Sequence, residues 1–86
     1  MILVTGGTGL VGAHLLFSLC EDRQLCRAIY RDAKGLEAVK KLFISYGDLN
    51  LARYKTIEWV LGDILDLEGL RIAFKKVNTV YHCAAP

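Results

Sequence analysis

The chain has 86 residues, of which 53% are hydrophobic and 23% are charged, and its formal net charge is +2. That length allows one small domain with a thin core. The apolar content is too high for a disordered chain, and the charge excess is too small for a typical nucleic-acid binder. No apolar run approaches the roughly 20 residues of a membrane-spanning helix. We therefore expect a soluble, cytoplasmic domain without nucleic-acid or membrane partners.

The cysteines and histidines do not form a metal or disulfide pattern. Three cysteines stand at positions 20, 26 and 83, with no Cys-x-x-Cys spacing, and there are only two histidines. An odd, scattered set of this kind favours free thiols over a disulfide framework or a zinc site. We expect no metal.

The first half of the chain predicts two short strands separated by a helix. Residues 1–5 are an apolar run that ends at a glycine pair, which is typical of a buried strand. Residues 10–21 carry leucines at helical spacing, which predicts a helix, and residues 27–30 predict a second short strand that begins near residue 25.

The next segment predicts a helix, a further helical turn and a strand. Asp32 is a suitable N-cap for a helix from about residue 35 to residue 42. A further turn is expected at residues 49–54. Residues 56–61 predict a third strand, in which Trp59 alternates with Ile57 and Leu61. We therefore expect Trp59 in the core, and the alternative is a platform for stacking.

The last segment predicts one more helix and one more strand. Asp66 is a good cap for a helix with an apolar stripe formed by Leu67, Leu70, Phe74 and Val77, and residues 77–83 supply the fourth strand. Strands that alternate with helices in this order build a parallel sheet with right-handed crossovers, so the fold class is α/β.

A glycine-rich segment lies between the first strand and the first helix. Residues 5–12 are Thr-Gly-Gly-Thr-Gly-Leu-Val-Gly, in which Gly7, Gly9 and Gly12 match G-x-G-x-x-G. Glycines allow a tight turn and a close approach of a pyrophosphate to backbone amides at the positive end of a helix. No Gly-Lys-[Ser/Thr] ends the motif, which excludes a Walker A loop. The segment predicts a dinucleotide site, and the alternative is a tight turn without a ligand.

The chain resembles the short-chain dehydrogenases/reductases, in particular the extended or atypical branch that includes epimerases, dehydratases and dihydroflavonol-reductase-like enzymes. Residues 5–12 are similar to the TGGTGFIG of that branch, and residues 62–64 to its Gly-Asp-[Ile/Leu/Val]. Residues 80–85 are similar to its V-[FY]-H-x-A-A. The resemblance implies a partial doubly wound Rossmann fold, with a parallel sheet of about four strands in the order 3-2-1-4 and flanking helices. Residues 1–86 would be the N-terminal part of one NAD(P)-binding domain.

The resemblance also assigns cofactor contacts, position by position. Those around the pyrophosphate would be Gly6, Gly7, Thr8, Gly9, Leu10, Val11 and Gly12. Asp63 and Ile64 would contact the adenine, and Ala84 and Ala85 would leave room for the ribose and the nicotinamide side. The alternatives are a turn or capping role for Asp63 and close helix–sheet packing for the two alanines.

The choice between NADP and NAD depends on the end of the second strand. An acid about 20 residues beyond the glycines binds the ribose 2′-hydroxyl of NAD. Arg31 occupies that place, nineteen residues after Gly12 (31 − 12). Its planar guanidinium suits a 2′-phosphate, so the sequence favours NADP. A shift by one residue would bring Asp32 to the ribose and favour NAD, and the remaining alternative for Arg31 is a solvated loop charge.

No catalytic residue is identified. The catalytic Tyr and Lys of the family have no counterpart here, since Tyr30 and Lys34 show the Y-x-x-x-K spacing only at a strand end, and His82 matches a non-catalytic histidine. Two functions stay open. One is the dinucleotide-binding segment of an NAD(P)-dependent oxidoreductase or epimerase/dehydratase acting on a small molecule. The other is a non-catalytic NADP sensor. The unpaired edge of the fourth strand also predicts self-association, for example as a homodimer.

Overall fold

The computed structural model describes residues 1–62 and 67–83. Its elements follow one another as β1 (Ile2–Thr5), α1 (Leu10–Glu21), β2 (Cys26–Tyr30), α2 (Ala33–Ser45), α3 (Asn50–Tyr54), β3 (Glu58–Leu61), α4 (Leu67–Ala73) and β4 (Thr79–His82). The four strands are parallel and form one sheet in the order β3-β2-β1-β4. The predicted α/β class and the predicted strand order are confirmed.

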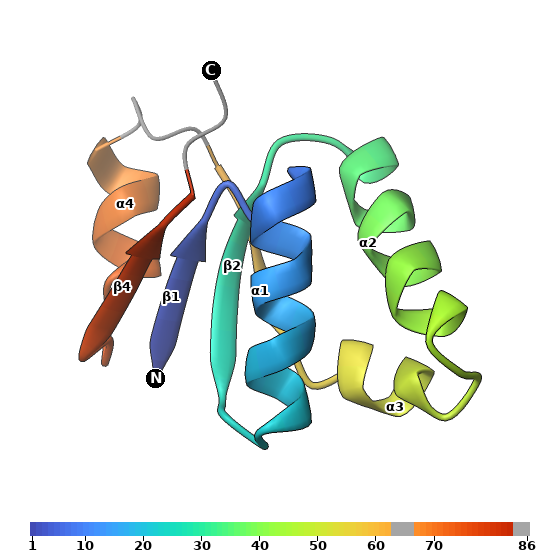
Figure 1. Cartoon of the computed structure of the whole chain (residues 1–86). Helices are drawn as coiled ribbons and strands as arrows, with labels where there is room; N and C mark the ends of the chain where they lie inside the picture. The colour runs from blue at the N-terminus through green and yellow to red at the C-terminus, as the bar shows by residue number, and fades with distance from the viewer. Residues whose placement is uncertain (63–66, 84–86) are drawn as a thin grey trace.

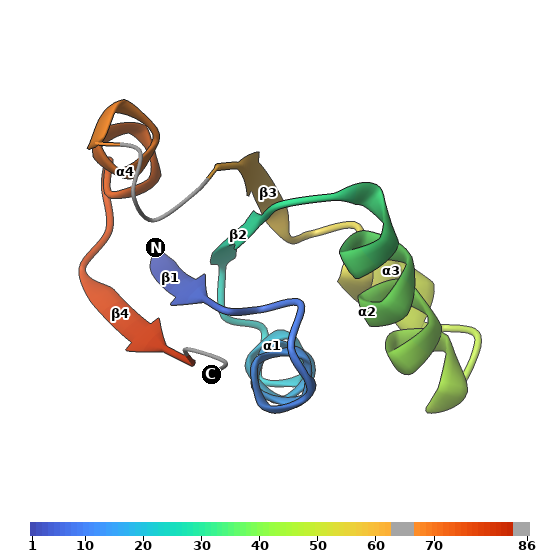
Figure 2. The same cartoon turned by 90° about the horizontal axis from the view of Figure 1, so that it is seen from above.

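Helices cover both faces of this sheet, as Figures 1 and 2 show. α1, α2 and α3 lie on one face, and α4 lies on the other. Side chains alternate along β1, so Val4 packs into the core under α1 and α2, while Leu3 packs against Ala73 of α4. The larger core contains Leu16 of α1 and Phe43 of α2, both fully buried.

The second helix begins earlier and ends later than the sequence indicates. α2 spans Ala33–Ser45, and the predicted cap is confirmed, because the Asp32 carboxylate accepts a hydrogen bond from the Gly35 amide at 3.0 Å. The predicted turn at residues 49–54 is α3. β3 starts at Glu58 and β4 at Thr79, each two residues later than expected.

Two predicted core assignments differ from the structure. Leu61 ends β3 and is exposed, whereas Trp59 is half-buried against the larger core. In the last helix, Leu70 and Val77 pack on the smaller core, but Leu67 and Phe74 are exposed. The predicted four-residue stripe is therefore wrong at two positions. Both exposed side chains lie at the ends of the helix, because α4 begins at Leu67 and its last residue, Ala73, directly precedes Phe74.

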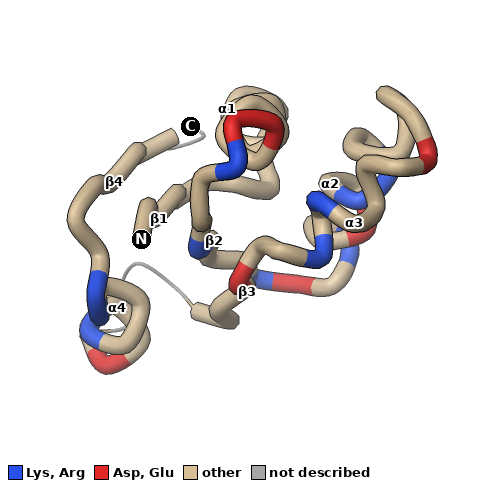
Figure 3. The backbone as a smooth tube through the Cα atoms, turned by 90° about the horizontal axis from the view of Figure 1, so that it is seen from below, with Lys and Arg blue, Asp and Glu red and all other residues tan. Residues whose placement is uncertain are grey.

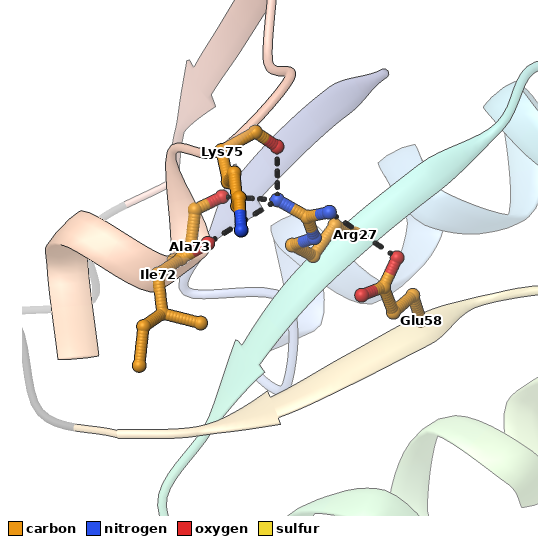
Figure 4. Close-up of polar contacts among 5 residues, drawn as sticks. All are labelled: Arg27, Glu58, Ile72, Ala73 and Lys75. Carbon is orange, nitrogen blue, oxygen red and sulfur yellow. Dashed lines mark hydrogen bonds and ion pairs between the residues drawn. The ribbon is translucent and has the colours of Figure 1, made fainter.

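A buried arginine in the middle of β2 fixes the end of α4. The Arg27 guanidinium donates through Nη1 to the carbonyl oxygens of Ala73 at 2.7 Å and Lys75 at 2.6 Å, with a longer contact of 3.5 Å to Ile72. Its Nη2 lies 3.3 Å from the Glu58 carboxylate on β3. Figure 4 shows this guanidinium between the last turn of α4 and the neighbouring strand. The contact satisfies carbonyls that a helix end otherwise leaves unpaired.

Candidate functional site

The loop between β1 and α1 is folded so tightly that side chains do not fit in it. Gly6 has φ = 69°, in the left-handed region that favours glycine. The Gly9 amide donates to the Gly6 carbonyl at 3.1 Å, which closes the turn. A Cβ on Gly12 would lie 2.1 Å from the same carbonyl oxygen, and one on Gly7 would lie 2.9 Å from Leu16. The loop is thus pressed against both the helix and the sheet.

The first turn of α1 faces outward with its backbone amides uncapped by side chains. Gly9 is the N-cap residue, with extended backbone and no side-chain hydrogen bond, and the first turn holds no acidic residue. Leu10 and Val11 are 76% and 73% exposed. The first amides of a helix have no partner within it, and their dipoles make this end positive. The arrangement suits an anion that approaches along the helix axis.

The ends of β1 and β2 bring a second group of residues beside this loop. Both strands are parallel neighbours, so their carboxyl ends and the first turns of α1 and α2 lie at one end of the molecule (Figure 1). Arg31 and Asp32 follow β2 directly and are exposed. The Asp32 carboxylate is engaged in capping its own helix. The structure therefore brings Arg31 to the same edge of the sheet as the glycine loop, as the sequence predicts.

β4 is joined to β1 at this same edge by a side-chain hydrogen bond. Thr5 Oγ1 lies 2.5 Å from His82 Nδ1, and the Cys83 amide donates to the Thr5 carbonyl at 3.0 Å. His82 is thus engaged in joining the ends of two strands. The predicted contact residues Asp63, Ile64, Ala84 and Ala85 lie outside the described residues.

The groups with displaced pKa values lie away from this edge. Two causes raise the pKa of the Cys26 thiol at the start of β2: its hydrogen bond with Cys20 is the larger, and its burial is the second. Burial, followed by the charge of Glu37, raises the pKa of Tyr54 at the end of α3. These groups lie at the opposite ends of their elements from the glycine loop, so they take no part in the candidate site.

Residues 1–62 and 67–83 show no metal site, no membrane-spanning helix and no basic surface of the kind that binds nucleic acid. No group of three metal-ligating side chains is found among them. None of their helices has the length and apolar character needed to cross a membrane. Lysines and arginines are interspersed with acids over the helices rather than gathered on one face (Figure 3). The strand order and the glycine-rich turn after β1 are features of the α/β folds in which dinucleotide sites occur.

The family is shown by comparison with known proteins. Residues 2–86 match the model of the NAD dependent epimerase/dehydratase family, and the chain belongs to this family. It is 33% identical over 84 residues to a 3-beta-hydroxysteroid dehydrogenase of Mycolicibacterium neoaurum, a match that covers 98% of the chain and 19% of that protein. The resemblance to the extended short-chain dehydrogenases/reductases is confirmed.

Solved structures show the same fold. An isoflavone reductase superposes with a TM-score of 0.73 at 24% identity, over 98% of this chain and 26% of that one. Vestitone reductase from alfalfa (Medicago sativa) gives 0.72 at 20% identity, over 99% and 25%. A structure titled AtPrR2 with NADP+ and (+)pinoresinol gives 0.63 at 26% identity, over 98% and 25%. The chain thus spans only about a quarter of each of these proteins.

Proposed function

We propose that this chain is the dinucleotide-binding segment of an NAD(P)-dependent oxidoreductase, and that the glycine loop at residues 6–12 holds the pyrophosphate. The observation that carries the proposal is a tight turn of glycines that leaves the amides at the start of α1 without side-chain caps. A Cβ on Gly12 would lie 2.1 Å from the Gly6 carbonyl, while the amides at the start of α1 have no side-chain cap. When bound, the nicotinamide dinucleotide would supply hydride-transfer chemistry to a small-molecule substrate.

Individual residues would bind and orient the cofactor without taking part in chemistry. The amides around Gly9 would donate to the pyrophosphate, and the exposed side chains of Leu10 and Val11 would flank it. Asp63 and Ile64 would contact the adenine, and Ala84 and Ala85 would leave space for the ribose and nicotinamide. The roles of these four residues rest on the family motifs alone.

We favour NADP over NAD as the cofactor. Arg31 follows β2 at the edge where a ribose 2′-phosphate would lie, and its guanidinium suits that anion. The acid that would select NAD is Asp32, and its carboxylate already accepts a hydrogen bond from the Gly35 amide. Arg31 is also the reason that, for the activity of the full-length protein, we favour a carbonyl reductase over a nucleotide-sugar epimerase or dehydratase.

The test is a titration of the chain with NADP and with NAD, followed by the fluorescence of its single tryptophan, Trp59. Arg31→Ala should weaken NADP binding by about tenfold, because it removes a charge-assisted hydrogen bond, and should leave NAD binding within about twofold. Lys55→Ala, which removes a positive charge before β3 at the other end of the strands, is the matched control. Equal losses for both cofactors would contradict the assignment of Arg31, and no binding of either would contradict the proposed function.

The alternative function is a non-catalytic NADP sensor of the atypical branch. A sensor would bind NADP as the enzyme would, so the two functions are distinguished by the presence of catalytic residues. A gene product with a Tyr-x-x-x-Lys pair about sixty residues downstream, after a strand ending in Ser or Thr, would favour the enzyme. The predictions of a cytoplasmic location and of no nucleic-acid or membrane partner stay as expectations from the sequence.

A further inference from the structure

The first turn of α2 packs against the Thr8 side chain of the glycine loop at Gly35, a position that has no side chain of its own. A Cβ built on Gly35 would lie 2.9 Å from both Cβ and Cγ2 of Thr8 and 3.4 Å from its Oγ1. Contacts of 2.9 Å are closer than real Cβ atoms tolerate, so the neighbouring atoms would have to move. Thr8 is the middle residue of the loop, between Gly7 and Gly9.

Both α2 and the glycine loop are fixed in place by contacts on the sides that face away from each other. α2 is anchored by Val39 and Phe43, which are fully buried in the larger core. On the other side, the Gly9–Gly6 hydrogen bond and the close approach of Gly12 fix the backbone of the loop. An added methyl group at position 35 would therefore press on the Thr8 side chain, so that α2 or the loop would have to shift to admit it.

The contact also connects two parts of the proposed site: the glycine loop, which would hold the pyrophosphate, and the segment of Arg31, which would hold the 2′-phosphate. The Gly35 amide donates to Asp32, which ties the first turn of α2 to the segment that contains Arg31. Thr8 lies in the loop proposed to hold the pyrophosphate. The contact of Gly35 with Thr8 therefore constrains the separation of Arg31 from that loop, in addition to the pairing of β1 with β2.

We infer that Gly35 is a positioning residue for cofactor selection: its lack of a side chain holds the segment of Arg31 at the distance from the glycine loop that NADP requires. This inference rests on the proposed function. NADP would have to reach both the loop and Arg31, whereas NAD has no 2′-phosphate and depends less on their separation. Gly35 itself would touch neither cofactor.

The experiment compares Gly35→Ala with the wild-type chain in titrations with NADP and NAD, together with thermal unfolding. Gly35→Ala should weaken NADP binding by about tenfold and NAD binding by no more than about threefold, because overpacking moves one anchor relative to the other. Replacing a helical glycine by alanine ordinarily stabilises a helix, so a purely structural role would not lower NADP affinity selectively. Ala38→Ser adds one atom on the exposed side of the same helix and should change neither cofactor's affinity.

The rescue variant Thr8→Gly removes the atoms with which the new methyl group would collide. In a Thr8→Gly background, Gly35→Ala should change NADP affinity by less than about twofold. The same comparison applies if Gly35→Ala alone does not fold, since the double variant has room for the methyl group. A wild-type chain that binds NADP, with an unchanged preference in Gly35→Ala or an undiminished loss in the Thr8→Gly background, would overturn the inference. A wild-type chain that binds neither cofactor would instead overturn the proposed function.

Discussion

Gly12 and Gly7 are required for different physical reasons. A Cβ on Gly12 would collide with backbone, the carbonyl of Gly6, which cannot rotate away. A Cβ on Gly7 would instead meet side chains, those of Leu16 at 2.9 Å and Ala28 at 3.3 Å. Gly12 therefore permits the loop to fold back on the helix, and Gly7 permits the loop to lie on the sheet. Both keep the first turn of α1 at the carboxyl end of β1.

The charge at that first turn can be changed without disturbing the packing. Val11 is exposed, and the first turn of α1 contains no acid. Val11→Asp should stabilise the helix by about 0.5 kcal/mol, because a carboxylate is favourable near a helix N-terminus. The same carboxylate would repel a pyrophosphate, so binding of both NADP and NAD should fall by about tenfold or more. Chemical denaturation measures the stability, and the cofactor titration measures the binding.

Val11→Asn is the matched control for this prediction, since it has nearly the same shape without the charge. It should retain most of the affinity. If Val11→Asp binds either dinucleotide as tightly as the wild-type chain does at low salt, the anion does not lie at the start of α1.

At α4, one side chain of a neighbouring strand determines where the helix ends. Arg27 is buried, and its Nη1 pairs with carbonyls of Ala73 and Lys75 at 2.7 and 2.6 Å (Figure 4). Lys76, with φ = 64°, then turns the chain toward β4. A helix that continued through Phe74 and Val77 would need these carbonyls for its own hydrogen bonds.

Arg27→Met should destabilise the chain by about 2–4 kcal/mol, because the carbonyls at the end of α4 lose their donors while the strand keeps an apolar residue of similar length. Urea unfolding followed by circular dichroism measures the loss. Glu58→Gln is the control on the other side of the guanidinium. Glu58 is exposed, so removing its charge should cost less than about 1 kcal/mol. Equal costs for both variants would mean that the ion pair, and not the helix end, is what Arg27 stabilises.

Local patterns were sufficient to predict the elements, but not the contacts between them. The apolar runs and the Asp32 cap predicted all four strands and three helices, because these signals act within a few residues. Arg27 was missed because a single arginine in a strand gives no sign of the helix end that it meets 46 residues later. Gly35 was missed for the same reason, since its partner Thr8 belongs to another element. The motif residues of the candidate site could be proposed from the sequence because they cluster along the chain.

The whole sheet has α1, α2 and α3 on one face and α4 on the other, with β4 at one edge (Figure 2). All four residues of β4 are exposed. Among the described elements, α4 contacts β2 and β3, and Val80 and Tyr81 of β4 are 44% and 42% exposed. Apolar side chains on an edge strand with unpaired backbone groups invite pairing with another chain.

The isolated 86-residue chain should therefore self-associate as its concentration rises, through pairing of β4 with a second strand. Light scattering coupled to gel filtration over about a hundredfold range of concentration measures the apparent mass, which should rise with concentration by mass action. A double change, Val80→Lys and Tyr81→Lys, places two positive charges on that edge and should shift the chain toward the monomer, while Leu49→Lys, an exposed apolar position before α3, should not. A wild-type chain that stays monomeric without ligand at high concentration would show that β4 does not act as a pairing edge.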